Sequence, residues 1–447
     1  MRPFFFIAAL VGVATCHPTL KFARGNLTPE GFTKIHPGGI DDVEVTEENT
    51  LNSTTFANST HGAVRRDVIG AKLPLKFVNN YSGGPLNAYI SGLDSNGAVV
   101  FVATDGSLIY PISAGSTVPV PVTEIIAIPI DTSGETIEFN LPIEMSSGRI
   151  YFAEGELSFY TVNTGNGDGL VQPSVTNLQD ASAAINWGFV EFTYTGGVIY
   201  ANISYVDFVG MILGMLLSVT DGTTQSAAGL QANSVADICN DLVTQGADGY
   251  PWSSMCLANS AGTPIRVLSP GNYYGLNPDG FTSYWTSYVD QVWSTYTNSP
   301  LTIKTQTGAG DVSCQVSGDE LVCNGDNRGY AKPAANDIWG CNTGPFAIIE
   351  GDNDIHKAIV PRLCAAFVRS TLLLEGGNVQ PSLGGDSYYT VDPTSHYSRV
   401  IHKYEVDGKG YAFPYDDVNP DGNENASGTV SSGNAESLTI YIGAPPS

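Results

Sequence analysis

Short strand-forming runs follow one another from Leu73 to about Thr220, and this alternation constrains the fold more than any other feature. Stretches such as LNAYISGLD, AVVFVATDG and TIEFNL are rich in β-branched and aromatic residues, and turns of Gly, Ser, Asn and Pro separate them. FVEFTY, Gly196-Gly197 and VIYANISYVDF predict a tight hairpin. The 50 glycines, 26 prolines and a charged fraction of only 14% argue against a helical bundle or coiled coil.

Apolar residues take up helical spacing after about Gln225. They recur at that spacing in 235–242, in 281–296 after a capping Asp279, and within 355–373. After about Ser387 the runs YSRVIHKYEV, YAFPYDD and SLTIYIG read as strands again. The predicted fold is mainly β with an α/β insert: a β-sandwich or barrel in 73–220, a mixed α/β domain in 221–386, and strands in 387–447 that return to the sandwich.

The N-terminal part of the chain predicts a secreted protein. Residues 1–16 carry Arg2, a short apolar run and small residues, as a cleavable signal peptide does. Residues 17–66 are polar and end in Arg65-Arg66, so they are either a pro-segment cut after Arg66 or a disordered tail that is never cut. We expect the protein to be secreted, extracellular or associated with a cell wall, and to be a monomer.

Six cysteines follow the predicted signal peptide, and an even number in a secreted chain implies three disulfides. Spacing leaves 15 pairings open. We favour the pairs closest in sequence, which are 239–256, 314–323 and 341–364. N-glycosylation sequons, expected of a secreted chain, stand at Asn26, Asn52, Asn58, Asn80, Asn202 and Asn425.

A formal charge of −25 excludes several partners. Nucleic acid and anionic membranes would be repelled, whereas an uncharged polysaccharide would not. The sequence has no HExxH, GxSxG, P-loop or dinucleotide-binding motif, and its histidines lack ligand spacing, so we predict no metal and no cofactor.

Carboxylates remain as the available chemistry, and a pair of them suits glycoside hydrolysis. A given acidic residue is more often simply solvated surface. Aromatic rings add weight because sugar rings stack on them; Trp187, Trp252, Tyr273 and Tyr274 are candidates, whereas Trp285, on a helical stripe, is assigned to the core.

Long segments of the chain resemble glycoside hydrolase family 64, the secreted β-1,3-glucanases of the thaumatin-like superfamily. They include GRIYF (148–152), LVQPSVTN (170–177), INWGFVEFTY (185–194), RVLSPGNYYGLNP (266–278) and GKGYAFPYDDV (408–418). The resemblance covers nearly all of 73–447. It implies a β-sandwich packed on a mixed α/β domain, with a broad acidic groove between them that holds a β-1,3-glucan chain, and an inverting hydrolysis.

The resemblance places the two family catalytic positions on Gln172 and Gly188, neither of which can transfer a proton. Asp168, Glu191 and Asp207 are the candidate substitutes. Glu191 and Asp207, together with Asp416 or Asp417, resemble positions that line the acidic cleft of thaumatin-like proteins. A simple hairpin register would set Glu191 opposite Asn202 and turn Asp207 to the other face, unless a bulge changes the parity.

Two functions of different classes follow. The first is a secreted endo-β-1,3-glucanase that uses Asp168 or Glu191 with Asp207. The second is a non-catalytic β-1,3-glucan-binding protein that kept the groove and lost the acids. A wall-associated structural or defence protein is a weaker third reading.

Overall fold

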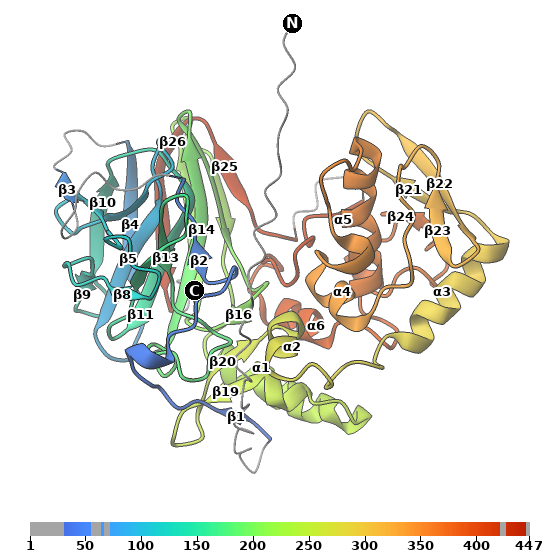
Figure 1. The fold of residues 1–447 in the computed structure, drawn as a ribbon, viewed down its shortest axis with the longest axis horizontal. Helices are drawn as coiled ribbons and strands as arrows, with labels where there is room; N and C mark the ends of the chain where they lie inside the picture. Colours follow the sequence, from blue (N-terminus) through green and yellow to red (C-terminus); the bar gives the residue numbers. More distant parts are fainter. Residues whose placement is uncertain (1–30, 55–63, 67–71, 421–425, 444–447) are drawn as a thin grey trace, which may run out of the picture.

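The computed structural model describes residues 31–54, 64–66, 72–420 and 426–443. The predicted signal peptide and the sequons at Asn26, Asn58 and Asn425 lie outside these residues. Figure 1 shows most strands gathered in one half of the molecule and α3, α4 and α5 in the other. Within the described ranges, no helix is long and apolar enough to cross a membrane.

Two large sheets pack face to face and form the β-rich half. Phe77 and Phe152, one from each sheet, meet edge to face with ring centroids 5.0 Å apart. The larger sheet has the order β25-β15-β14-β11-β5-β6-β7-β3, with β9 also paired to β5. Its strands are β25 (Val430–Ser432), β15 (Val198–Ile203), β14 (Trp187–Thr195), β11 (Met145–Glu154), β5 (Leu86–Leu93), β6 (Val99–Val102), β7 (Leu108–Tyr110), β3 (Val64–Arg66) and β9 (Ile128–Ile130).

The second large sheet has the order β10-β4-β26-β17-β18 and places the last strand of the chain at its centre. Its strands are β10 (Thr136–Leu141), β4 (Leu73–Asn79), β26 (Ala435–Ile442), β17 (Leu213–Val219) and β18 (Thr224–Ala227). Every second residue of β4 is buried, because one face of the strand packs on the core.

Two four-stranded sheets include residues upstream of Arg65. One has the order β2-β13-β12-β8, with β2 (Thr50–Leu51), β13 (Asp168–Val171), β12 (Tyr160–Asn163) and β8 (Val120–Pro121). The other has the order β1-β19-β20-β16, with β1 (Thr33–Lys34), β19 (Cys256–Ala258), β20 (Pro264–Leu268) and β16 (Phe208–Val209). Residues 31–54 are therefore not a disordered tail; they add a strand to each sheet.

The remaining four-stranded sheet has the order β23-β22-β21-β24 and lies in the helical half. Its strands are β23 (Glu320–Cys323), β22 (Asp311–Ser317), β21 (Leu301–Lys304) and β24 (Val379–Gln380). In the described part of the chain the α-helices are α1 (Ser234–Gln245), α2 (Pro270–Leu276), α3 (Thr286–Asn298), α4 (Ala335–Gly340), α5 (Asp354–Val368) and α6 (His396–Tyr404). Short 3-10 helices are η1 (Ile40–Asp42), η2 (Gly246–Asp248), η3 (Trp252–Met255), η4 (Gly344–Phe346) and η5 (Gly385–Ser387).

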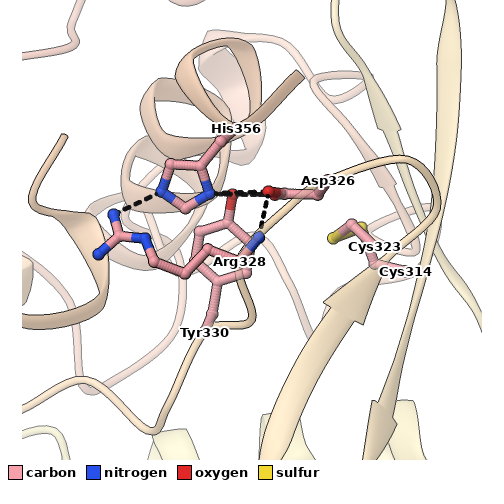
Figure 2. The surroundings of a disulfide bond; sticks show 6 residues. All are labelled: Cys314, Cys323, Asp326, Arg328, Tyr330 and His356. Carbon is pink, nitrogen blue, oxygen red and sulfur yellow. Dashed lines mark hydrogen bonds and ion pairs between the residues drawn. A yellow bond between two sulfur atoms is a disulfide. The ribbon is translucent and has the colours of Figure 1, made fainter. Parts of the chain in front are cut away.

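The three predicted disulfides are confirmed: Cys239–Cys256, Cys314–Cys323 and Cys341–Cys364. The second joins directly opposed residues of the β22–β23 hairpin. Figure 2 shows that a buried polar cluster follows this hairpin. His356 of α5 is fully buried, and its Nδ1 lies 3.0 Å from both Asp326 Oδ1 and the Tyr330 hydroxyl, which ties the hairpin to the helix.

The predicted strand in YSRVIHKYEV is wrong, because these residues form α6. The Ser395 hydroxyl accepts the N–H of Ser398 and caps the helix, while Tyr397, Val400 and Ile401 are buried at helical spacing. YAFPYDD is not a continuous strand either; it consists mainly of turns and bends. The helix expected after Asp279 begins only at Thr286, since residues 279–285 form turns.

Candidate active-site groove

Arg149 of β11 stands at the centre of the candidate site. In the antiparallel pairing of β11 with β14, Arg149 lies directly opposite Glu191. Its Nη2 donates to Glu191 Oε1 at 3.0 Å and its Nη1 donates to Gln172 Oε1 at 3.1 Å. The guanidinium also lies over the ring of Phe189, 4.5 Å from its centroid. Cross-strand pairing and ring stacking thus hold one cation between two polar side chains.

Asp207 follows a break after β15 and lines the same cavity as Arg149. The hairpin register predicted from Gly196-Gly197 is confirmed, with Glu191 opposite Asn202. The strand ends at Ile203, however; Ser204 forms an isolated bridge with Tyr411 and residues 206–207 bend, so the parity expected for a continuous strand does not apply to Asp207. Its carbonyl accepts N–H groups from Ser269 at 2.9 Å and Asn272 at 3.1 Å, which fixes the bend.

Burial is the main cause of a raised pKa for Asp207. Arg149 opposes this shift, whereas the nearby negative charges of Glu191 and Glu48 add to it. A carboxyl group with a raised pKa keeps its proton to higher pH, which is what a general acid requires.

Two cavities share Arg149 and Glu48, and together we call them the Arg149 groove. The first, of about 390 Å³, is lined by Glu48, Thr50, Leu51, Ser147, Arg149, Gln172, Glu191, Phe192, Thr193, Tyr200 and Asn202. The second is lined by Thr46, Glu48, Asn49, Arg149, Pro173, Ser174, Val175, Thr176, Trp187, Phe189, Asp207, Phe208 and Asn272.

The two positions matched to the family's catalytic residues differ in how they are packed. Gln172 lines the first cavity and points its amide oxygen at Arg149, so a glutamate would fit its place. Gly188 has no such room. A Cβ added there would lie 2.8 Å from the carbonyl oxygen of Met211, whose N–H is bonded to the Trp187 carbonyl at 3.0 Å.

Asp168 is not brought to the groove. It is 4% exposed, and its Oδ1 accepts the N–H of Ser113 at 2.9 Å and the Ser113 hydroxyl at 2.6 Å. Of the three proposed substitutes, the structure gathers only Glu191 and Asp207 around Arg149.

Of the four aromatic residues predicted to stack on sugars, Tyr274 alone is exposed. Trp187 lines the second cavity but is 2% exposed, so little of its ring is open to a ligand. Trp252 is fully buried against Phe281 and Tyr284, and the prediction that it binds sugar is wrong. Tyr273 is also buried and packs on Phe281. Tyr274 is 38% exposed but does not line the Arg149 groove.

Asp416 belongs to a different cluster. It is 1% exposed, pairs with Arg369 at 2.9 Å and contacts His402 Nε2 at 2.9 Å. These groups border a separate cavity of about 590 Å³ that includes Asp416 and His402. Asp417, its neighbour, is exposed and lines neither part of the Arg149 groove. Asp416 and Asp417 are thus not among the residues that line the Arg149 groove.

Sequence reasoning missed three residues of the groove: Arg149, Tyr200 and Glu48. Arg149 carried a signal, because it is the sole Lys or Arg between residues 77 and 265 and lies within a strand-forming run. Tyr200 is 54% exposed and lies two positions from Asn202 on β15, which places both on one face of the sheet. Glu48 gave no local signal.

Comparisons with known proteins agree on one family. The family model for β-1,3-glucanases of glycoside hydrolase family 64 matches residues 71–442. Glucan endo-1,3-β-glucosidases of Arthrobacter sp. (strain YCWD3) and Cellulosimicrobium cellulans are 27% and 26% identical over 364 residues, which is 80% of this chain. The matched region spans 63% of the length of each of these relatives.

Solved structures give the same answer for the fold. A laminaripentaose-producing β-1,3-glucanase, solved in complex with laminaritetraose, matches with a TM-score of 0.74 and 27% identity, covering 84% of this chain and 99% of that one. A β-1,3-glucanase domain from Clostridium beijerinckii matches with a TM-score of 0.63 and 22% identity, covering 83% and 98%. The mainly β fold is thereby established.

Proposed function

This chain belongs to glycoside hydrolase family 64, the β-1,3-glucanases, and from that premise we propose that it is a secreted endo-β-1,3-glucanase acting at the Arg149 groove. The observation that carries the proposal is the placement of Glu191 and Asp207 around Arg149. Two carboxyl groups in different environments are what acid–base hydrolysis of a glycosidic bond needs.

In this proposal Asp207 is the general acid. It gives its proton to the glycosidic oxygen as the bond to the anomeric carbon breaks, so that the leaving sugar departs as an alcohol. Its burial and its raised pKa support this role. The backbone N–H of Ser269 and the side-chain amide of Asn272 both donate to the Asp207 carbonyl and keep the backbone of the acid in place.

Glu191 is the proposed general base. It accepts a proton from the water that attacks the anomeric carbon, in the inverting course that the family resemblance implies. Arg149 orients this carboxylate through the 3.0 Å contact, and the Glu191 side chain is 35% exposed, which gives water a route to it. Tyr200 offers an exposed ring at the rim against which a sugar can stack.

Further parts of the proposal concern the whole molecule. We propose a thaumatin-like arrangement in which the β-rich half packs on a mixed α/β domain in 221–386. Three disulfides support an oxidising, extracellular setting, since such bonds persist there. The proposed ligand is β-1,3-glucan, and we propose that the protein binds it as a monomer.

The test measures new reducing ends from a soluble β-1,3-glucan, beside a pull-down on insoluble glucan. Glu191→Gln and Asp207→Asn are each expected to lower the rate by about 10²–10⁴-fold, because each removes a positioned acid or base. Glu138→Gln is the matched control: Glu138 is also a strand glutamate paired with a cation, Lys76, but it lies outside the groove.

Two outcomes would contradict the proposal. Binding to glucan without any new reducing ends would identify a non-catalytic glucan-binding protein, which Gln172 and Gly188 would then explain. A rate that neither substitution changes would place the acid and base elsewhere.

A further inference from the structure

Within residues 44–51, Thr46 and residues 48–51 line the groove, although they precede the part of the chain that the family model matches. That match begins at residue 71. The earlier residues are nevertheless built into the fold: β1 runs parallel to β19, and β2 pairs antiparallel with β13. Figure 1 shows β2, in blue, among the green strands of the β-rich half. The segment is thus an addition that folds against the family's own framework.

The contacts of this segment follow the edge of the site. Next to β2, the carbonyl of Asn49 accepts the N–H of Gln172 at 2.8 Å, directly at one family catalytic position. Farther upstream, the carbonyl of Asp42 accepts the side-chain N–H of Asn177 at 2.7 Å. The segment is therefore held along the stretch that follows β13.

Asn49 shapes the chain where it crosses the groove. Its side chain is 7% exposed; its Oδ1 accepts the N–H of Thr46 at 2.9 Å and its Nδ2 donates to the carbonyl of Glu44 at 2.8 Å. Residues 44–49 are thereby fixed as a compact turn. Glu48 sits within this turn and borders both cavities.

The segment borders both parts of the groove. Thr46 and Asn49 border the cavity that contains Asp207, whereas Thr50 and Leu51 border the cavity that contains Gln172 and Glu191. Glu48 borders both cavities, so a glucan chain that reached both carboxylates would run past Glu48. The two proposed catalytic residues therefore face separate cavities while the segment is present.

We propose that residues 44–51 are an autoinhibitory strap that excludes a β-1,3-glucan chain from the Arg149 groove until the strap leaves. This inference rests on the proposed function of the groove. Arg65-Arg66 supplies the place of release: both residues lie in β3, which pairs only with β7 at the end of the largest sheet. After a cut there, β1 and β2 would be held by non-covalent contacts alone.

Binding of a soluble β-1,3-glucan to the full chain tests the strap. All proteins carry Arg65→Ala and Arg66→Ala so that residues 31–66 stay attached. Adding Leu51→Pro removes the backbone N–H that faces Leu170 in the β2–β13 pair and is expected to tighten apparent binding by at least about tenfold, because the blocked state no longer dominates. Lys34→Pro is the matched control, since it places the same residue in β1, outside the groove, and should change nothing.

Glu48→Ala provides a second variant that leaves the strand pairing intact. It should tighten binding in the same direction but less, and circular dichroism verifies that each variant is folded. Equal binding by all of these chains would overturn the strap while leaving the glucanase proposal standing. No binding by any of them would overturn both.

Discussion

The Arg149 groove and the Arg369 cluster, which comprises Arg369, His402, Glu405 and Asp416, both set an arginine among carboxylates, but Arg369 is buried whereas Arg149 is partly exposed, and their charge balance differs. Among the residues that line the groove, Arg149 is the sole cation beside Glu191, Asp207 and Glu48, and the pKa of the partly buried Asp207 is raised. In the Arg369 cluster two cations face two acids. Burial acts to raise the pKa of Asp416, but the positive charges of His402 and Arg369 outweigh the effect of burial, so this pKa is lowered.

The two clusters therefore differ in the positive charge that each acid meets. Asp416 and Glu405 raise the pKa of His402 to about 10 although burial acts against them, so His402 is charged at neutral pH. Burial raises the pKa of Glu405, as it does that of Asp207, whereas the pKa of Asp416 is lowered, and Asp416 holds α6 through His402 and the turn at 412–416 through the N–H of Ala412. The groove, short of positive charge, leaves one carboxyl group able to hold a proton.

Asp416→Asn is expected to have the largest effect on stability and so tests the difference between the two clusters most strongly. The substitution leaves the buried Arg369 without a counter-charge, while His402 keeps Glu405 at 2.8 Å, and the free energy of unfolding should fall by about 3–5 kcal/mol. Chemical denaturation measures it. Glu191→Gln in the half-exposed Arg149 pair should cost less than about 1 kcal/mol. Equal losses in the two variants would show that both clusters are structural.

Restoring the family's acids one at a time separates packing from charge within the groove. Gly188→Asp should lower the free energy of unfolding by about 1–3 kcal/mol, because its Cβ meets the Met211 carbonyl at 2.8 Å. Gln172→Glu keeps the shape and the contact with Arg149, so it should fold normally and raise the rate of glucan hydrolysis. Denaturation curves and reducing-end assays measure the two effects, and a stable Gly188→Asp would contradict the packing argument.

The smallest expected effect is the pH dependence of stability that Asp207 contributes. Its folded-state pKa lies above the usual 3.8, so the folded protein binds the proton more tightly than the unfolded chain. Stability should therefore fall as pH rises from 3.8 through the raised value. Asp207→Asn should flatten this slope in a series of denaturation curves. A slope that steepens or stays unchanged would mean that Asp207 is not the group that holds the proton.

Much of the fold follows from local sequence. The Gly196-Gly197 turn fixes the β14–β15 register, and nearest-neighbour cysteines give the three disulfides. YSRVIHKYEV fails as a strand because the Ser395 cap and burial on one helical face outweigh its β-forming residues. The secondary structure of such residues is determined by their tertiary contacts and not by local propensity.

The site was less predictable for the same reason. Glu191 and Asp207 could be named because they flank a hairpin, but the bend at 206–207 that brings Asp207 to the cavity of Arg149 is held by Ser269 and Asn272, more than 60 residues away. Trp252 and Tyr273 looked equally suited to stack sugars, and only tertiary packing shows that both are buried. Likewise, nothing in the local sequence of residues 44–51 indicates that this segment borders the groove.

The place of β26 has a consequence for how the protein is made. This strand, close to the end of the chain, lies between β4 and β17, parallel to the first and antiparallel to the second. This sheet cannot close until residues 435–442 have left the ribosome, so β4 and β17 are synthesised well before the strand that joins them. Such pairing between distant parts of the chain makes the closure of the sheet slow.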